Sequence, residues 1–470
     1  MVVQHNLQAM NANRMLNITT GAQSKSTEKL SFGYKINRAA DDAAGLTISE
    51  KMRKQIRGLD QASTNAQDGV SSVQTAEGAL TEVHSMLQRM NELAVQASNG
   101  TNAESDRQAI QDEIDQLTTE IDRVSETTKF NETYLLKGEA GTKLINMKAH
   151  DAGLKGSLTD NGDGTATFKM DTLNAGDKIS IGGKQYTIGS TADQAKALYN
   201  GVKVDGTETV TINGKEYKVQ DTNPSADKGE ISKAELDKLV KGGVTVEYKG
   251  KSATVITDDA QKGGVAADGV DDLDPSIITD KKAYELASKE LLAANQIGDT
   301  ENSAKVTVGG TTDAVTLANA TNEFTINVGQ AKVANSLAFS LHVGADADMT
   351  NKIQVNIDSM DSASLGIKGL NVKDDSGKAA TYAVDAIADA VAKVSSQRSA
   401  LGAVQNRLEH TIDNLDNVVE NTTSAESRIR DTDMAEEMVN YSKNNILAQA
   451  GQSMLAQANQ STQGVLSLLQ

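Results

Sequence analysis

Side chains that could do chemistry are few in this sequence and lie far apart. The five histidines stand at positions 5, 84, 150, 342 and 410, never four residues apart as in a helical zinc-binding pair. Cysteine is absent, which removes thiolate catalysis, disulfides and Cys-based zinc sites. No Gly-x-Ser-x-Gly elbow and no phosphate-binding loop occurs either. We therefore predict a protein that is not an enzyme and needs no cofactor or metal.

The best pattern for a cation site lies in residues 224–235. The turn glycine and the last ligand of an EF-hand loop would fall on Gly229 and Glu235. Two of the early ligand positions would fall on Ala226 and Lys228, which offer no side-chain oxygen. We therefore favour a glycine turn followed by a capped helix.

Two clusters of mixed charge near the chain ends invite an acid–base interpretation. They consist of Arg38, Asp41 and Asp42 at one end and of Arg428, Arg430 and Asp431 at the other. Charges of this kind more often fix the register between subunits of an assembly. The two clusters pairing with each other is a further hypothesis.

Composition excludes several classes of partner. The formal net charge is −18, whereas binding to nucleic acid or to an anionic membrane surface requires clustered cations. No apolar stretch is long enough to span a membrane. The first 20 residues lack the apolar run of a secretory signal peptide, so export would need a dedicated route.

The distribution of arginine divides the chain into two flanks and a middle. No Arg occurs between Arg123 and Arg398, and both prolines, Pro224 and Pro275, fall inside that stretch. Most of the negative charge and of the glycine also lies there. The middle is therefore a different kind of sequence, with the composition of a solvated outer surface.

Apolar residues spaced alternately four and three apart predict three long helices in the flanks. The three seams are Met52, Ile56, Leu59, Ala66, Val70, Val73, Leu80 and Leu87; Ile110, Ile114, Leu117, Ile121 and Val124; and Ile387, Val391, Val394, Leu401, Leu408, Ile412, Leu415 and Val419. Residues 98–102 read as a turn between the first two helices. Since each seam must be buried, we expect an antiparallel bundle in which the two flanks meet.

The outermost segments carry weaker amphipathic stripes. Leu7 and Met10 belong to the first, and Ile446, Met454 and Leu468 belong to the last. Isolated helices of this kind are marginal in water. We predict that both segments are disordered in the free subunit and fold on assembly.

The middle of the chain has the alternation and turns of β-structure. Residues 178–188 and 209–219 predict hairpins, and 336–344 with 352–357 predict another strand pair. Short helices are expected near 193–199 and 281–294. The predicted fold is mainly an α-helical coiled-coil core of paired N- and C-terminal segments, with an inserted β-rich (α+β) outer region.

Four runs of sequence resemble the signatures of bacterial flagellins. Residues 29–46 and 88–96 are similar to the N-terminal signature, and residues 395–408 and 425–433 are similar to the C-terminal one. The resemblance covers roughly residues 1–140 and 337–470. It implies a structural subunit that polymerises with copies of itself into the extracellular flagellar filament for swimming.

The resemblance also implies a domain order. Residues 1–44 with 430–470 would form inner-core terminal helices. Residues 45–150 with 337–429 would form a helical spoke with a small β-hairpin, and residues 151–336 a variable outer insertion of two small units.

Several partners follow from the same resemblance. The family is exported unfolded through the flagellar type III apparatus, and an export chaperone holds the C-terminal helix. The subunit would also meet the filament cap and the hook-associated junction proteins.

Phe32 departs from the family pattern, which usually has a small residue there. A large ring beside Gly33 would fill a pocket between subunits or strain the joint between end helix and spoke. We expect filaments that are straight or altered in waveform.

In related flagellins the flagellin-sensing Toll-like receptor of animals reads the convex face of the spoke. The matching positions here are Arg89, Leu93 and Glu113. They could equally be contacts between subunits, and both roles can hold together.

Two alternatives stay open. A hook–filament junction protein shares the terminal helices and the export route. Alternatively, the insert is a glycan-binding adhesin that the filament carries, although few aromatic side chains are available to stack on sugars.

Overall fold

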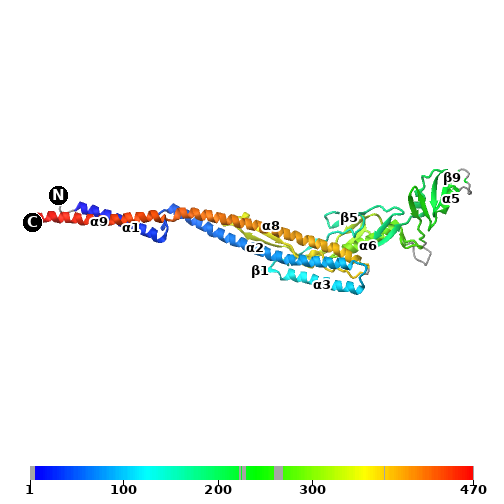
Figure 1. Ribbon diagram of the computed structural model, residues 1–470, viewed down its shortest axis with the longest axis horizontal. Helices are drawn as coiled ribbons and strands as arrows, with labels where there is room; N and C mark the ends of the chain where they lie inside the picture. Colours follow the sequence, from blue (N-terminus) through cyan, green and yellow to red (C-terminus); the bar gives the residue numbers. More distant parts are fainter. Residues whose placement is uncertain (1–5, 222–223, 225–228, 259–267, 375, 469–470) are drawn as a thin grey trace. The chain divides into compact units, whose positions relative to one another are not determined.

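The structure is a computed structural model, shown in Figure 1. It describes residues 6–221, 224, 229–258, 268–374 and 376–468, with side chains up to residue 461. The chain forms two compact units. The first comprises Met1–Ser71, Ser340–Val355 and Ala403–Gln470, and the second comprises Ser72–Phe339 and Asn356–Gly402.

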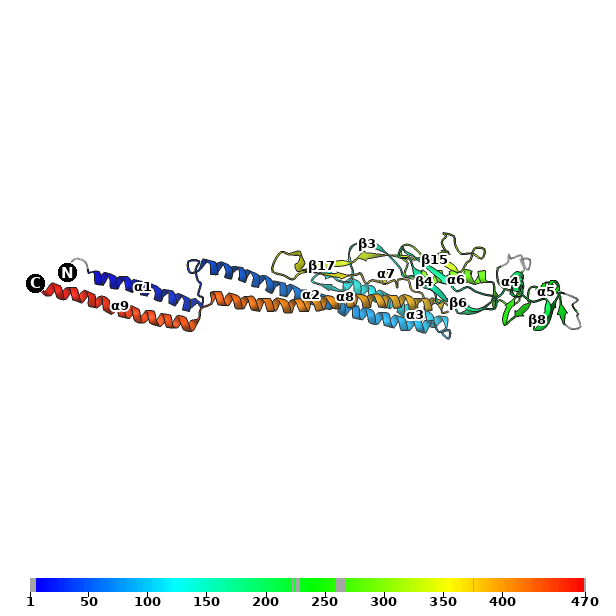
Figure 2. The same cartoon turned by 90° about the horizontal axis from the view of Figure 1, so that it is seen from above.

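The terminal helices of the first unit form an antiparallel pair. Helix α1 (Leu7–Phe32) begins after the cap Asn6 and ends at Gly33, whose φ of 75° requires the left-handed region. Its start lies beside the end of α9 (Met434–Leu468), where Asn6 Nδ2 donates to Ala458 O at 3.0 Å. Its last turn lies beside the start of α9, where Lys29 and Glu437 are 3.6 Å apart. Figure 2 shows the pair.

The rest of the first unit is built on two long helices, the beginning of α2 (Ala43–Ala97) and the end of α8 (Lys378–Arg430). The loop end of the hairpin β17 (Leu337–His342) and β18 (Lys352–Ile357) packs on them. Their shared core contains Ala66, Val343, Ile353 and Leu408. A Cβ at Gly69 would lie 2.2 Å from Leu341 Cδ1, so glycine permits this close approach.

In the second unit, α2 and α8 continue and α3 (Glu104–Thr127) joins them. The predicted seams are its core, since Leu80, Leu87, Ile114, Ile121 and Leu401 are at most 1% exposed. The turn between α2 and α3 lies where it was predicted. Three long helices at these positions confirm the heptad interpretation.

Strands of this unit form several small sheets. The short pair β1 (Lys129–Phe130) and β2 (Thr133–Tyr134) follows α3, and β3 (Glu139–Asn146) pairs with β16 (Gln330–Asn335). A four-stranded sheet has the order β14 (Lys305–Val308), β15 (Glu323–Asn327), β5 (Thr165–Met170), β4 (Gly156–Asp160). A three-stranded sheet has the order β13 (Ile277–Ile278), β7 (Lys184–Ile188), β6 (Lys178–Ile181).

A five-stranded sheet has the order β10 (Glu230–Ile231), β9 (Lys215–Gln220), β8 (Asp205–Ile212), β11 (Thr245–Tyr248), β12 (Lys251–Thr254). The short helices are α4 (Ala192–Leu198), α5 (Lys233–Leu239), α6 (Asp280–Asn295) and α7 (Ser362–Leu365), with a 3₁₀ turn η2 at Met349–Asn351 in the first unit. Both predicted hairpins, the strand pair and the two short helices are confirmed.

Two hydrophobic clusters lie within residues 151–336. One gathers Phe168, Phe324 and Tyr284, with ring centroids 6.3 and 6.4 Å apart. The other is built around Tyr199 and Leu236. The division of the chain into domains at 44, 150, 336 and 429, with two small units in the insert, stays a prediction.

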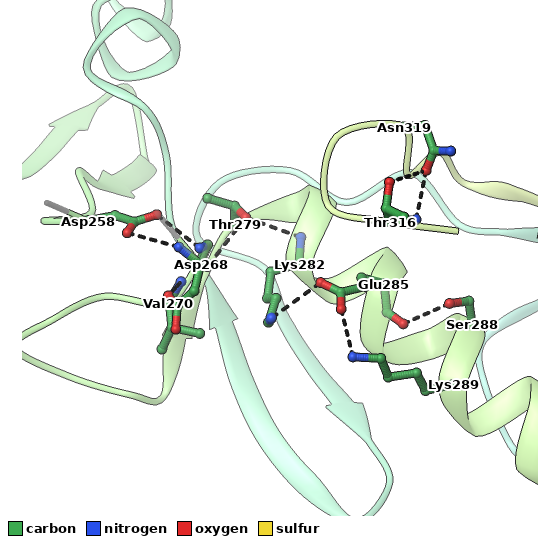
Figure 3. A network of polar contacts seen from close by, with 11 residues as sticks. Asp258, Asp268, Val270, Thr279, Lys282, Glu285, Ser288, Lys289, Thr316 and Asn319 are labelled. Atoms are coloured by element: carbon green, nitrogen blue, oxygen red, sulfur yellow. Dashed lines mark hydrogen bonds and ion pairs between the residues drawn. The ribbon is translucent and has the colours of Figure 1, made fainter. Parts of the chain in front are cut away.

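Helix α6 is held by a network of polar contacts, shown in Figure 3. Thr279 caps its first turn by accepting a hydrogen bond from Lys282 N at 3.1 Å. Glu285 pairs with Lys282 at 3.2 Å and with Lys289 at 2.6 Å. Asp258 accepts from Gly269 N at 2.9 Å, so its carboxylate holds the chain that leads into α6.

Candidate functional site

The surface of the terminal helices α1 and α9 is unusually apolar. Eleven of the large apolar side chains in this pair are exposed: Leu7, Met10, Met15, Ile18, Phe32, Met434, Met438, Val439, Ile446, Leu447 and Met454. Buried side chains in the two helices are few, with Ser26 and Ala448 below 9% exposed. Soluble monomers rarely leave such a stripe uncovered, so this pair has the character of a contact surface. Leu468 ends α9, and its side chain lies outside the described residues.

Backbone pairing joins the two chain segments next to these helices. Tyr34 and Asp431 form an isolated antiparallel bridge. Lys35 N donates to Arg430 O at 2.6 Å, and Thr432 N donates to Gly33 O at 3.0 Å. The segment that follows α1 and the segment that precedes α9 are thus hydrogen-bonded to each other within the first unit.

Arg430 packs against the same bridge. Its guanidinium carbon lies 4.6 Å from the centroid of the Tyr34 ring, and its side chain is 15% exposed. Glu426 Oε1 lies 3.9 Å from Arg430 Nη1, and it also accepts a hydrogen bond from Ser49 Oγ at 2.8 Å. Asp431 accepts from Ser427 Oγ at 2.6 Å, and Arg428 is exposed.

The charged cluster before α2 makes local contacts. Asp41 pairs with Lys25 at 3.0 Å and accepts from Arg38 N at 3.0 Å, and these bonds lower the pKa of Asp41 to about 2. Arg38 pairs with Glu28 at 3.0 Å, and Asp42 accepts from Gly45 N at 2.9 Å in the first turn of α2.

Within the described residues of the single chain, the two charged clusters form no ion pair with each other, and pairing between subunits stays a hypothesis. Each cluster has its ion pairs and side-chain hydrogen bonds with nearer partners, and the backbone bridge at Tyr34 supplies the connection instead. Sequence reasoning missed Tyr34 because an isolated bridge leaves no periodic pattern.

Phe32 is the last residue of α1 and is 63% exposed. The backbone turns away at Gly33, so the ring does not pack into the joint of its own chain. Strain from the ring inside a single subunit is therefore not observed, and its contact with neighbouring subunits stays a prediction.

Arg89 and Glu113 form an exposed ion pair between α2 and α3. Arg89 Nε lies 2.9 Å from Glu113 Oε1, and Arg89 Nη1 lies 3.2 Å from Glu92 Oε2. Hydrogen bonds with Glu113 and Glu92 raise the pKa of Arg89. About half of each side chain in the Arg89–Glu113 pair is exposed, so both can meet a partner.

Leu93 differs from the expectation that it lies on this surface. It is 1% exposed, so its side chain packs in the core beneath Arg89 and a partner cannot reach it in this structure. Helix α2 has neighbours on two sides, α3 and α8, which widens its buried face beyond one heptad seam (Figure 1).

The cation-site pattern in residues 224–235 resolves into a capped helix where it is described. Ser232 caps α5, and its Oγ accepts from Glu235 N at 3.3 Å. Ala226 and Lys228 lie outside the described residues. Within the described part of the chain, no three His, Asp or Glu side chains gather as metal ligands, and no helix is long and apolar enough to cross a membrane.

Comparison with known proteins decides the family. The sequence model of the bacterial flagellin N-terminal helical region matches residues 3–140, and that of the C-terminal helical region matches residues 384–469. The flagellin of Clostridium tyrobutyricum is 39% identical over 466 residues, which cover 98% of this chain and all of that protein. The chain belongs to the bacterial flagellin family.

Other flagellins match over the same length. The flagellin of Bacillus subtilis (strain 168) is 35% identical over 472 residues, covering 100% of both chains. Flagellin B of Vibrio anguillarum is 35% identical over 467 residues, covering 99% of both. Like its relatives, this flagellin is a structural subunit that polymerises with itself into the extracellular flagellar filament, and the paired helices with a β-rich middle are the flagellin fold.

Proposed function

We propose that this flagellin polymerises by burying the exposed apolar stripe of α1 and α9 against neighbouring subunits. The observation that carries this proposal is the exposure of Leu7, Met10, Ile446 and Met454, each at least 62% accessible in the single chain. Burying one such side chain contributes roughly 1.5–3 kcal/mol. Leu468 would extend the stripe at the end of α9.

The bridged joint would then set the register of the terminal helices within the filament. Arg38, Asp41 and Asp42 keep their local contacts, and Arg428 offers a free cation to a neighbour, while Arg430 and Asp431 hold the bridge. Phe32 would insert between subunits and so influence the waveform.

Export of the subunit is proposed to follow the family route. The chain would pass unfolded through the type III export apparatus while a chaperone covers the apolar face of α9. It would then fold beneath the filament cap, above the hook-associated junction proteins. The inner helices (1–44 with 430–470), the spoke (45–150 with 337–429) and the outer insert (151–336) would form successive layers.

Recognition by the flagellin-sensing Toll-like receptor is proposed for the face that carries Arg89 and Glu113. Their ion pair is exposed and joins the two helices α2 and α3. Leu93 would contribute by packing in the core and stabilising α2, and it would not contact the receptor.

A polymerisation assay tests the central proposal. Purified subunits are seeded with filament fragments, and elongation is followed by light scattering and microscopy. Deletion of residues 1–30 or of 445–470 is expected to abolish elongation, because each removes a part of the apolar stripe. Deletion of residues 150–330 is expected to leave elongation unchanged, since the insert contributes none of the apolar stripe.

Normal elongation after either terminal deletion would contradict the proposal. Circular dichroism of each deletion variant provides the control, because the helices α2, α3 and α8 should keep their signal. Loss of that signal would indicate a folding defect, and the single substitutions discussed below would then carry the test.

A further inference from the structure

A cavity of about 280 Å³ lies in the second unit, outside the surfaces used for assembly or recognition. It is lined by the end of β3 and the segment after it, by the segment after α6, by α7, and by α8. Figure 2 labels these four elements. Met147, Ile297, Leu365 and Ala386 supply apolar walls. Its size is at the lower end of the range for small-molecule sites.

Two buried polar atoms on the cavity lining have no hydrogen-bond partner. Ser364 is 3% exposed and its Oγ is unpartnered. Asp389 Oδ1 pairs with Lys148 at 2.7 Å, but Asp389 Oδ2 is buried and has no hydrogen bond, with His150 Nε2 3.5 Å away. Buried polar groups are nearly always satisfied, so these two atoms point to a missing partner.

Lys393 adds a cation to the same lining. Its ammonium donates to Ser364 O, the carbonyl of the residue whose hydroxyl is unpartnered. Burial lowers the pKa of Lys393. An ammonium has three donors, so those not used at Ser364 O remain available to an anionic group.

The cavity thus presents a carboxylate oxygen, an ammonium and a hydroxyl around apolar walls. A simple anion would be repelled by Asp389, and a simple cation would be repelled by Lys148 and Lys393. A molecule with both charges would satisfy each group. We propose that the cavity binds a small zwitterion of the α-amino acid class, with its ammonium at Asp389 Oδ2 and its carboxylate at Lys393 and Ser364 Oγ.

The test uses the full chain as a monomer with ¹³C-labelled methionine methyl groups. L-Alanine is titrated in, and the Met147 methyl signal should shift in a saturable way while that of Met349, exposed in the first unit, stays fixed. Acetate and methylammonium, each bearing one charge, should bind at least tenfold more weakly. Saturation by acetate with the same affinity would reduce the site to an anion site and overturn the zwitterion assignment.

Substitutions then test the two unpartnered atoms. Ser364→Ala removes a hydroxyl that has no partner in the fold, so the melting temperature should hold while alanine binding falls at least threefold. Asp389→Asn should weaken binding more strongly. The control Ser157→Ala, at an exposed position of β4, should change neither.

No shift of Met147 up to the solubility limit of alanine would show that the cavity does not bind the amino acid. Equal binding by Ser364→Ala and the unmodified chain would show that the Ser364 hydroxyl makes no contact with it. Either result overturns the proposal. Polymerisation is not needed for any of these measurements, so their failure leaves the proposed assembly surface untouched.

Discussion

At the scale of single residues, the exposed pair of Arg89 and Glu113 can be separated from assembly. Arg89→Ala removes contacts to Glu113 at 2.9 Å and to Glu92 at 3.2 Å, all on the surface. We expect receptor binding, measured by surface plasmon resonance, to fall at least tenfold while the melting temperature and seeded elongation stay unchanged.

A matched control for this substitution is Arg123→Ala. Arg123 lies on α3, is 59% exposed, and pairs with its neighbour Glu120 in the same manner. It should leave receptor binding intact. Equal losses from the two variants would mean that net charge, and not the Arg89 face, governs the interaction.

Asp41 makes the segment between α1 and α2, which we call the joint, sensitive to acid. Contacts with Lys25 and with the backbone lower its pKa from 3.8 to about 2, so the folded joint disfavours the protonated form. The stabilisation is present above pH 3.8 and is lost as the pH falls toward 2. Asp41→Asn should lower the melting temperature at neutral pH. Near pH 2 the melting temperatures of the variant and of the unmodified chain should be the same.

Calorimetry between pH 2 and pH 6 measures this effect. Asp60→Asn, which removes an exposed carboxylate of the same unit, serves as the control for the loss of one negative charge. An Asp41→Asn difference that is just as large at pH 2 would rule out the ion-pair explanation.

Phe32 is 63% exposed at the end of α1, so we expect it to affect the filament and not the isolated subunit. Phe32→Ser should leave the melting temperature of the monomer unchanged. In electron micrographs, the filaments should differ in waveform from those of the unmodified chain. Identical waveforms would show that the ring makes no contact that matters between subunits.

At the scale of elements, what could be predicted depended on how local the determining pattern is. The seams that contain Leu80, Ile114 and Leu401 repeat over many turns, so the three helices could be read directly from the sequence, as could the turn between the first two. The hairpin at Lys178–Ile188 could be predicted as readily, because its turn lies between two short alternating runs. Each of these elements needs only its own residues.

Pairings between distant strands could not be predicted in the same way. Strand β5 pairs with β15, which joins Phe168 to Phe324 across more than 150 residues, and β3 pairs with β16. Short strands of similar composition offer many equivalent partners, and only burial in the common core selects one. Leu93 was assigned to the receptor face by the resemblance to flagellins alone, and none of the three seams includes it, so no pattern in the sequence indicated its burial.

The terminal helices give the element-scale prediction. Ile446 is 67% exposed in the single chain, so Ile446→Ser should not affect the monomer. Losing roughly 1.5–3 kcal/mol of burial per subunit corresponds to a rise in critical concentration of about tenfold to a hundredfold. Sedimentation of filaments at a series of subunit concentrations measures it.

Leu144→Ser is the matched control, because Leu144 is 53% exposed on β3 and lies outside the terminal helices. Its critical concentration should equal that of the unmodified chain. Equal effects of the two substitutions would mean that exposed apolar area in general, and not the terminal stripe, drives polymerisation.

At the scale of the whole molecule, the chain combines two kinds of helix with different sources of stability. Helices α2, α3 and α8 bury their own seams, with Leu87, Ile121 and Leu408 fully inaccessible. Helices α1 and α9 bury little in the single chain and present apolar side chains to the outside. Since most helical stability comes from tertiary packing, the second kind should depend on neighbouring subunits.

Hydrogen exchange tests this dependence directly. In the dilute monomer, amides of residues 1–30 and of the second half of α9 should exchange rapidly, because local opening there exposes little additional apolar surface. In filaments the same amides should become strongly protected, whereas those around Leu87 and Leu408 should be protected in both states. Slow exchange throughout residues 1–30 in the monomer would mean that pairing of α1 with α9 alone completes the fold, and assembly would then join preformed helices instead of folding them.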